Sequence, residues 1–292
     1  MKTAVILSTY NAPDRLRPTL VGYAAQTHRD FELIVADDGS TGATRELIKD
    51  VSSQFSLPIK HVWHEDQGFR KCRILNQAIA STGADYLIFS DGDCIPRADF
   101  VATHLERARP GRFLSGGYFK LSAKASSRIT AEDILAGHAL DPQWLIANGM
   151  PRSRKLGRLA CSPWRAGLMN AITPTRPTWN GHNASGWRSD MIRINGFDER
   201  MAYWAQDREF GERLENSGVR GLQIRYSAIC VHLHHERPYK TKESRERNQQ
   251  IRRDTRRMRA RWTVHGIHKS PAPESDALMI TPADDVTVMR YA

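Results

Sequence analysis

The sequence predicts an α/β fold in which a mostly parallel, Rossmann-like sheet is flanked by helices. Two observations predict it. Apolar, β-branched runs alternate with helix-like segments through the first hundred residues, and acidic residues follow two of these runs. Because ligands of open parallel sheets bind beyond the carboxyl ends of the strands, both acidic motifs are expected at a binding site.

The predicted elements begin with a buried strand. Residues 3–9 (TAVILST) form a continuous apolar and β-branched run, which is typical of a strand covered on both faces. A helix follows, because Pro13 and Asp14 suit its first turn. The next predicted elements are a strand that ends at Asp37 and Asp38, a helix over 42–54, a short strand over 59–63, a helix over 70–80 and a strand over 84–91 (ADYLIFSD).

The pattern becomes less regular beyond residue 110. A strand is expected within 113–122 (FLSGGYFKLS), and a helical stretch over 131–149 is expected to break at Pro142. The segment 151–177 is basic and contains several prolines, with little clear periodicity. It is interpreted as a mobile connection or lid over a site, and an ordinary surface loop is nearly as good an interpretation.

The last third of the chain contains one well-marked helix and one well-marked strand. The helix covers 207–216, and Gly218 suits its C-terminal cap. The strand SAICVHLHH (227–235) delivers histidines, and a basic helix over 242–262 follows it.

The charge of the chain implies an anionic partner. The formal net charge is +11 and the pI is near 9.7, with 40% hydrophobic and 26% charged residues. A nucleic-acid-binding protein is one alternative, but the basic segment has few aromatic residues and matches no recognition motif, so no nucleic acid is expected. The basic helix is interpreted as a peripheral membrane anchor or a docking face for an anionic acceptor, or equally as a solvated helix with intrahelical ion pairs.

The cysteines and the apolar runs predict where in the cell the protein is located. The four cysteines have no CxxC spacing, so neither a zinc cluster nor a disulfide framework is expected, and a reducing cytosol is the simplest setting. The apolar run at the N-terminus is too short for a signal peptide, and no stretch is long enough to span a bilayer. We therefore expect a cytoplasmic protein, with a peripheral position on the inner face of the cytoplasmic membrane as the other option.

Two acidic motifs are candidates for ligand binding. Asp91 and Asp93 flank Gly92 directly after an apolar strand, where carboxylates can share Mg²⁺ or Mn²⁺ and Gly92 lets a ligand approach the backbone. Asp38, with Asp37, could accept hydrogen bonds from a base or a ribose. The alternative for either motif alone is a turn.

Histidines and a further aspartate complete the candidates. In an alternating strand, His232 and His234 share one face and His235 points away, and at least one of the three is expected to bind a metal. Asp207 begins a helix and could accept a proton from a substrate hydroxyl, although helix capping is the alternative role.

Taken together, these motifs resemble family 2 glycosyltransferases, which have the GT-A fold. The first part of the resemblance depends on VILSTYNAPDRL, ELIVADDGST, GFRKCRILNQAI and DYLIFSDGDCIP. The second part depends on NGHNASGWRSDMIRINGFDERM, WAQDREFGERL and HLHHERP, and is similar to a region shared by β-galactosyltransferases and bacterial chondroitin-type polymerases. The resemblance implies a nucleotide-sugar-binding half (1–110), an acceptor-binding and catalytic half of the same domain (111–240) and a basic helical C-terminal extension (241–292).

The resemblance also implies roles for individual residues. It places the nucleotide-sugar beside Thr9, Tyr10, Asp38, Arg70, Asp91 and Gly92. It assigns Mn²⁺ or Mg²⁺ to Asp93 and His235, with His232 or His234 as rivals. It makes Asp207 the general base and gives the acceptor pocket to Gly186, Trp187 and Trp204.

The activity implied is inverting, metal-dependent transfer from a UDP-sugar to a hydroxyl of a glycan or glycolipid in bacterial lipopolysaccharide or capsule synthesis. One departure is that the chain has Gln206-Asp207 where the family usually has Glu-Asp, which leaves the donor sugar open. A nucleotidyltransferase and an inactive scaffold are the rival interpretations.

Overall fold

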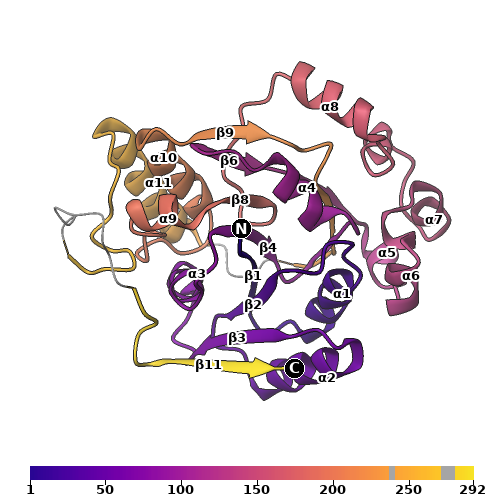
Figure 1. The fold of residues 1–292 in the computed structure, drawn as a ribbon, viewed down its shortest axis with the longest axis horizontal. Helices are drawn as coiled ribbons and strands as arrows, with labels where there is room; N and C mark the ends of the chain where they lie inside the picture. Colours follow the sequence, from indigo (N-terminus) through magenta and orange to yellow (C-terminus); the bar gives the residue numbers. More distant parts are fainter. Residues whose placement is uncertain (237–240, 271–279) are drawn as a thin grey trace.

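The computed structural model describes residues 1–236, 241–270 and 280–292, and its centre is one large sheet (Figure 1). In spatial order the strands of this sheet are β11 (Val286–Tyr291), β3 (Ile59–His64), β2 (Glu32–Asp37), β1 (Thr3–Thr9), β4 (Tyr86–Asp91), β8 (Ala184–Trp187), β6 (Arg112–Ser115) and β9 (Arg220–Gln223). A smaller sheet contains β5 (Cys94–Pro96), β10 (Ile229–His232) and β7 (Gly117–Lys120).

Helices surround the sheets. They are α1 (Pro13–Ala24), α2 (Gly42–Phe55), α3 (Lys71–Ala80), α4 (Phe100–Arg107), α5 (Ala123–Ser126), α6 (Ala131–Leu135), α7 (Pro142–Ala147), α8 (Pro163–Ile172), α9 (Arg188–Arg193), α10 (Gln206–Asn216) and α11 (Lys242–Arg257), with the short turns η1 (His138–Leu140) and η2 (Arg154–Arg158). None of the helices in these described ranges is long and apolar enough to cross a bilayer.

The predicted α/β architecture is confirmed. Strand β1 is buried on both faces: Ala4 and Ile6 belong to one apolar cluster, and Val5 and Leu7 belong to the other. Strands β1, β2, β3 and β4 are parallel, so their carboxyl ends lie along one edge of the sheet. There Ser8 of β1 is paired with Asp91, which brings the acidic motif to this edge.

Three segments have more regular structure than the sequence predicts. The segment 113–122 contributes to two strands, β6 and β7, in different sheets, and between them lies Gly116, where a Cβ atom would be 1.9 Å from Asn183 Oδ1. Segment 151–177 contains η2 and α8 and is not simply irregular. The C-terminal extension is not only helical, since β11 pairs antiparallel with β3 at the sheet edge.

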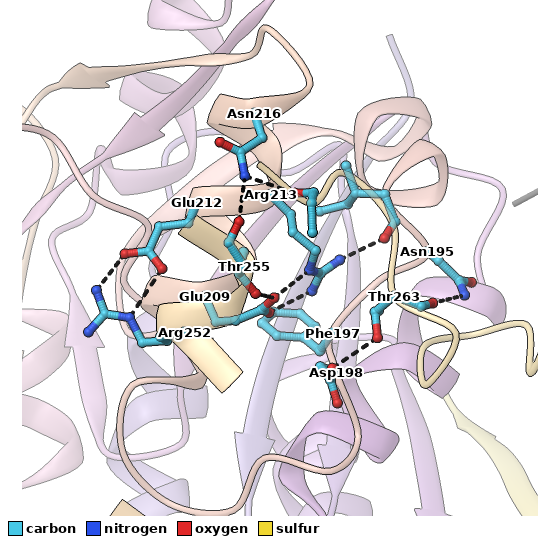
Figure 2. Close-up of polar contacts among 12 residues, drawn as sticks. Asn195, Phe197, Asp198, Glu209, Glu212, Arg213, Asn216, Arg252, Thr255 and Thr263 are labelled. Atoms are coloured by element: carbon cyan, nitrogen blue, oxygen red, sulfur yellow. Dashed lines mark hydrogen bonds and ion pairs between the residues drawn. The ribbon is translucent and has the colours of Figure 1, made fainter. Parts of the chain in front are cut away.

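The basic helix α11 packs along α10 through polar contacts (Figure 2). Thr255 donates a hydrogen bond to Glu209 at 3.0 Å, and Arg252 forms an ion pair with Glu212. Its large apolar residue Ile251 packs against the core. Intrahelical pairs such as Arg257 with Asp254 match the solvated-helix interpretation. The basic segment also includes residues 237–240, which lie outside the described residues.

We predict that the buried ion pair of α10 dominates the stability of this region. Glu209 and Arg213 are each 1% exposed and 2.7 Å apart. Glu209→Gln leaves the Arg213 guanidinium without a counter-charge, so we expect a loss of about 3 kcal/mol in the free energy of unfolding. Chemical denaturation measures it. The matched control is Glu215→Gln on the same helix, whose partner Arg176 is exposed, and it should cost less than about 1 kcal/mol. Equal losses in both variants would contradict the prediction.

Candidate active site

A pocket of about 350 Å³ opens at the carboxyl ends of β1 and β4, between the start of α10 and the end of β10. Most of the predicted site residues line it, namely Thr9, Tyr10, Asp38, Asp91, Gly92, Asp93, Asp207, His232 and His235. None of its lining residues among the described ones comes from 151–177, so the lid interpretation of that segment gains no support.

Asp91 is held as an anion in the floor of the pocket. Its Oδ1 accepts hydrogen bonds from Ser8 Oγ at 2.8 Å and from Lys71 Nζ at 2.6 Å. Burial opposes its ionisation, but the charge of Lys71 and the hydrogen bonds from Lys71 and Ser8 outweigh burial and hold the pKa of Asp91 well below its usual range. Gly92 donates its N–H to the Ser8 carbonyl at 2.8 Å and keeps the backbone close to β1.

Asp93 lies beside two histidine rings. Its Oδ2 is 2.9 Å from His235 Nε2 and 3.7 Å from His232 Nε2, and the two rings stack with centroids 5.3 Å apart. Each ring places Nδ1 2.7 Å from a backbone carbonyl, of Leu233 for His232 and of Glu236 for His235. A carbonyl only accepts, so each Nδ1 carries hydrogen, and Nε2 is the atom that each ring turns toward Asp93.

This arrangement fits a divalent cation. A carboxylate oxygen and an imidazole lone pair at 2.9 Å repel one another unless a proton or a metal ion lies between them. One divalent ion would satisfy both stacked rings, whereas two adjacent imidazolium ions would repel. A set of one oxygen and two nitrogen donors suits Mn²⁺ better than Mg²⁺, which prefers oxygen alone.

The neighbouring His234 does not extend this set. His234 was predicted to share a face with His232, but β10 ends at His232 and the His234 N–H donates to Ser126 Oγ at 2.9 Å instead. The prediction that His234 shares a face with His232 while His235 points away was therefore wrong. His235, and not His234, lies beside Asp93. Cys94 lies near Asp93 and His232, where its sulfur could serve as a further donor, and without a metal burial raises the pKa of its thiol well above the usual value.

Asp207 lies in the first turn of α10 and lines the same pocket. Burial raises its pKa to about 6, partly offset by the charge of Lys71, while the charge of Asp91 adds to the rise and the Gly181 N–H lowers it. Its Oδ1 is shielded from solvent and accepts no hydrogen bond from the described residues. A carboxylate with this pKa and a free oxygen is suited to accept a proton near neutral pH.

The loop before α10 is held by α11. Trp204 and Ala205 both have positive φ, 85° and 67°, which is unfavourable for residues with side chains. The wholly buried Asn248 donates its amide to the carbonyls of Ala202, Tyr203 and Trp204 at 3.0, 3.2 and 2.6 Å. These bonds stabilise the conformation that brings Tyr203 and Asp207 into the pocket.

The opposite side of the pocket carries Asp38 and Tyr10. Asp38 accepts hydrogen bonds from His64 Nε2 at 2.8 Å and from the Arg70 N–H at 2.9 Å, and burial raises its pKa. Tyr10 donates its hydroxyl to Asp66 at 2.8 Å and stays half exposed. An oriented carboxylate beside an exposed aromatic ring is suited to a nucleoside.

Several predicted residues lie elsewhere. Gly186 and Trp187 pair with Leu87 and Tyr86, at the end of β4 opposite Asp91, because β8 runs antiparallel to β4. The prediction that they form the acceptor pocket was therefore wrong.

Two more predicted residues are close to the pocket without lining it. Trp204 is not among the lining residues, although its neighbours Tyr203 and Gln206 are. The Arg70 guanidinium donates to the Glu65 carbonyl, so the hydrogen bond from Arg70 to Asp38 comes from its backbone N–H.

Sequence reasoning missed other residues of the pocket. They are Ser8, Ala12, Arg15, Phe69, Lys71, Ile74, Tyr118, His182 and Tyr203. Lys71 is the most consequential, because its ammonium faces Asp91 and influences Asp207 and Asp93. Burial opposes its charge, but these three carboxylates hold the pKa of Lys71 well above its ordinary value. Its place as the first residue of a helix that follows the strand-end loop was the available signal.

Comparison with known proteins confirms the resemblance found in the sequence. Residues 4–128 match the family model described as glycosyl transferase family 2. Chondroitin synthase of Escherichia coli is 26% identical over 261 residues, which cover 82% of this chain and 36% of that protein. Validoxylamine A glucosyltransferase of Streptomyces hygroscopicus subsp. jinggangensis is 28% identical over 250 residues, covering 81% of this chain and 56% of that protein. The chain thus spans about half or less of the length of these relatives.

Solved structures show the same fold. S. aureus TarS 1-349, in complex with UDP-GlcNAc, superposes with a TM-score of 0.58 and 16% identity, covering 86% of this chain and 64% of that one. The mannosyltransferase PcManGT from Pyrobaculum calidifontis, in complex with GDP-Man and Mn²⁺, gives 0.55 and 19%, covering 89% of this chain and 62% of that one. The GT-A fold is confirmed by these two similarities.

Proposed function

Because residues 4–128 of this chain match the model of glycosyl transferase family 2, we propose that the protein is an inverting, metal-dependent glycosyltransferase that uses a UDP-sugar and a glycan acceptor. The observation that carries the proposal is the convergence of Asp93, two imidazole rings and Asp207 on one pocket at the strand ends. A metal-binding carboxylate and a separate carboxylate of raised pKa are the two parts that such a transfer needs.

In the proposed reaction, Asp207 acts as the general base. It accepts the proton of the acceptor hydroxyl while that oxygen attacks the anomeric carbon, on the face opposite the leaving nucleoside diphosphate. The carbon–oxygen bond to the diphosphate breaks as the new glycosidic bond forms, so the configuration inverts. Asp93, His232 and His235 would hold the cation, which when bound neutralises negative charge on the diphosphate.

The remaining polar residues would bind the donor. Thr9, Tyr10 and Asp38 are placed to contact the nucleoside, and Asp91 is placed to face the ribose or water on the cation. Gln206 lies in the pocket, and its buried Oε1 accepts no hydrogen bond from the described residues. We assign it to a hydroxyl of the donor sugar, since an amide oxygen accepts such a bond without a negative charge.

The test is a panel of UDP-sugars assayed for Mn²⁺-dependent release of UDP with and without glycan acceptors. Release of UDP, absent in Asp93→Ala and Asp207→Asn, supports a glycosyltransferase. Release of pyrophosphate would instead support the rival nucleotidyltransferase. Full activity in both variants would overturn the site assignment.

The pH profile should show the titration of the base. Asp207 must be ionised to accept a proton, so kcat/KM should fall tenfold per pH unit below a midpoint near pH 6. In Lys71→Met, the cation that lowers the pKa of Asp207 is gone, and the midpoint should move upward. Initial rates from pH 5 to 8 measure both midpoints. A midpoint that stays the same or moves downward in the variant would contradict this arrangement.

The acceptor is proposed to be a bacterial cell-surface glycan or glycolipid, as in lipopolysaccharide or capsule synthesis. The support is general: the basic charge of the chain favours an anionic acceptor, and the similar region of the chondroitin synthase belongs to a polysaccharide-forming enzyme by its name. Incubation with candidate acceptors and mass spectrometry of the products would test this proposal.

A further inference from the structure

The helix α8 has its apolar side on the outside. Trp164, Leu168 and Ile172 are spaced four residues apart and are 73%, 51% and 61% exposed, so they form one exposed stripe along the helix. We define these three residues as the α8 stripe. The stripe is unusual because large apolar side chains on a surface helix normally face the core.

The inner side of α8 is held by small and polar contacts. Ala166 is buried, and Asn170 both donates its amide to Ser227 Oγ at 2.8 Å and accepts the Tyr226 N–H at 3.0 Å. Thr173, just beyond the helix, donates to the Met169 carbonyl. The orientation is therefore determined by these bonds, and rotating the stripe inward would break them.

The surroundings of α8 are cationic. From Pro142 to Ser189 the sequence contains no aspartate or glutamate but seven basic residues, namely Arg152, Arg154, Lys155, Arg158, Arg165, Arg176 and Arg188. Several of them, including Arg152, Arg154 and Lys155, are exposed. In Figure 1, α8 lies at the periphery of the molecule, beyond α4 and away from the centre of the sheet. An exposed apolar stripe beside the exposed positive charges of Arg152, Arg154 and Lys155 is the pattern of a helix that lies in a membrane interface.

From these observations we infer that α8 is an interfacial helix that docks the protein on an anionic lipid surface. The stripe enters the boundary between headgroups and acyl chains, with the Trp164 ring at headgroup level, while the nearby arginines and lysine contact lipid phosphates. The membrane contact is thereby assigned to α8 and not to α11, whose one large apolar residue faces the core. This inference is independent of the proposed reaction, since it needs neither donor nor cation.

The experiment is cosedimentation of the full chain with vesicles. Vesicles of phosphatidylcholine and phosphatidylglycerol in equal parts are compared with vesicles of phosphatidylcholine alone. We expect binding to the anionic vesicles, weakened at least about tenfold by Leu168→Gln/Ile172→Gln, because two apolar anchors are lost. Met258→Gln, which removes an equally exposed apolar side chain at the end of α11, should change binding less than about twofold.

Two charge variants compare how much the basic residues near α8 and those on α11 contribute to vesicle binding. Arg152→Gln/Lys155→Gln beside α8 should weaken binding to anionic vesicles, whereas Arg247→Gln/Arg253→Gln on α11 removes the same charge and should leave binding nearly unchanged. All these side chains are exposed, so thermal unfolding should be the same in every variant. Quenching of tryptophan emission by doxyl-labelled lipid should decrease in Trp164→Phe, which reports directly on the depth of the stripe.

Three results would overturn the inference. The first is a wild-type protein that does not bind anionic vesicles at low salt. The second is an α8 double variant that binds as well as the wild type. The third is a wild-type dimer in light scattering that the same double variant dissociates, because the stripe would then be an interface between protein chains.

Discussion

Replacing Asp207 with asparagine should abolish transfer and at the same time stabilise the fold. As the proposed base, Asp207 contributes the proton-accepting step, so kcat should fall about 10³-fold. The same carboxylate is costly to bury, because burial raises its pKa from 3.8 to about 6. The free energy of unfolding at pH 7 should therefore rise by on the order of 2 kcal/mol in Asp207→Asn.

The sign of this stability change depends on pH. A carboxyl group whose pKa is raised by folding destabilises the native state fully above the folded pKa, and the cost disappears as pH falls toward the unfolded value. Chemical denaturation should therefore show a large difference in the free energy of unfolding between wild type and Asp207→Asn at pH 7, and a small difference at pH 4. Asp190→Asn is the matched control, since burial also raises the pKa of Asp190 but it does not line the pocket, and its activity should stay within about twofold. Retained transfer in Asp207→Asn, or a less stable variant at pH 7, would contradict the role of Asp207.

The parts of the fold that were predictable have local causes. Strand β1 could be predicted from the sequence because both of its faces are buried, so its seven residues form one apolar and β-branched run. The positions of Asp91 and Asp93 could be predicted because they follow such a strand, and the carboxyl ends of parallel strands lie along one edge of the sheet. Here the chemistry of the site follows from the position of a residue along its own element.

Other parts depend on contacts between distant segments. Gly186 and Trp187 were misplaced because nothing in their sequence indicates that β8 runs antiparallel to β4. Lys71 was missed because its role arises only when α3 packs against the carboxyl ends of the strands. Asn248 was missed because the loop that it stabilises lies 44 residues away in the sequence. Helix α8 was missed because it is only ten residues long within a basic, proline-rich segment, and the outward direction of its apolar stripe follows from contacts with distant residues.

Asp93 and Asp91 should respond differently to the same substitution, although only Gly92 separates them. Asp93→Asn removes the anionic oxygen between the two imidazole rings, so the affinity for Mn²⁺ should fall at least about 10²-fold and added metal should not restore transfer. Asp91→Asn instead leaves the Lys71 ammonium without its partner at 2.6 Å, and we expect a loss of stability with Mn²⁺ binding largely kept.

Electron paramagnetic resonance of free Mn²⁺, titrated with each variant in the presence of UDP, measures the first effect, and chemical denaturation measures the second. The contrast follows from what each carboxylate faces: Asp93 faces the Nε2 atoms of two imidazole rings, whereas Asp91 faces the ammonium of Lys71. If Asp91→Asn lost Mn²⁺ binding and Asp93→Asn kept it, the prediction would be contradicted, and Asp91 would be the metal ligand instead of Asp93. The metal would then lie on the Lys71 side of the pocket, and the two histidines would have to be protonated to remain beside Asp93.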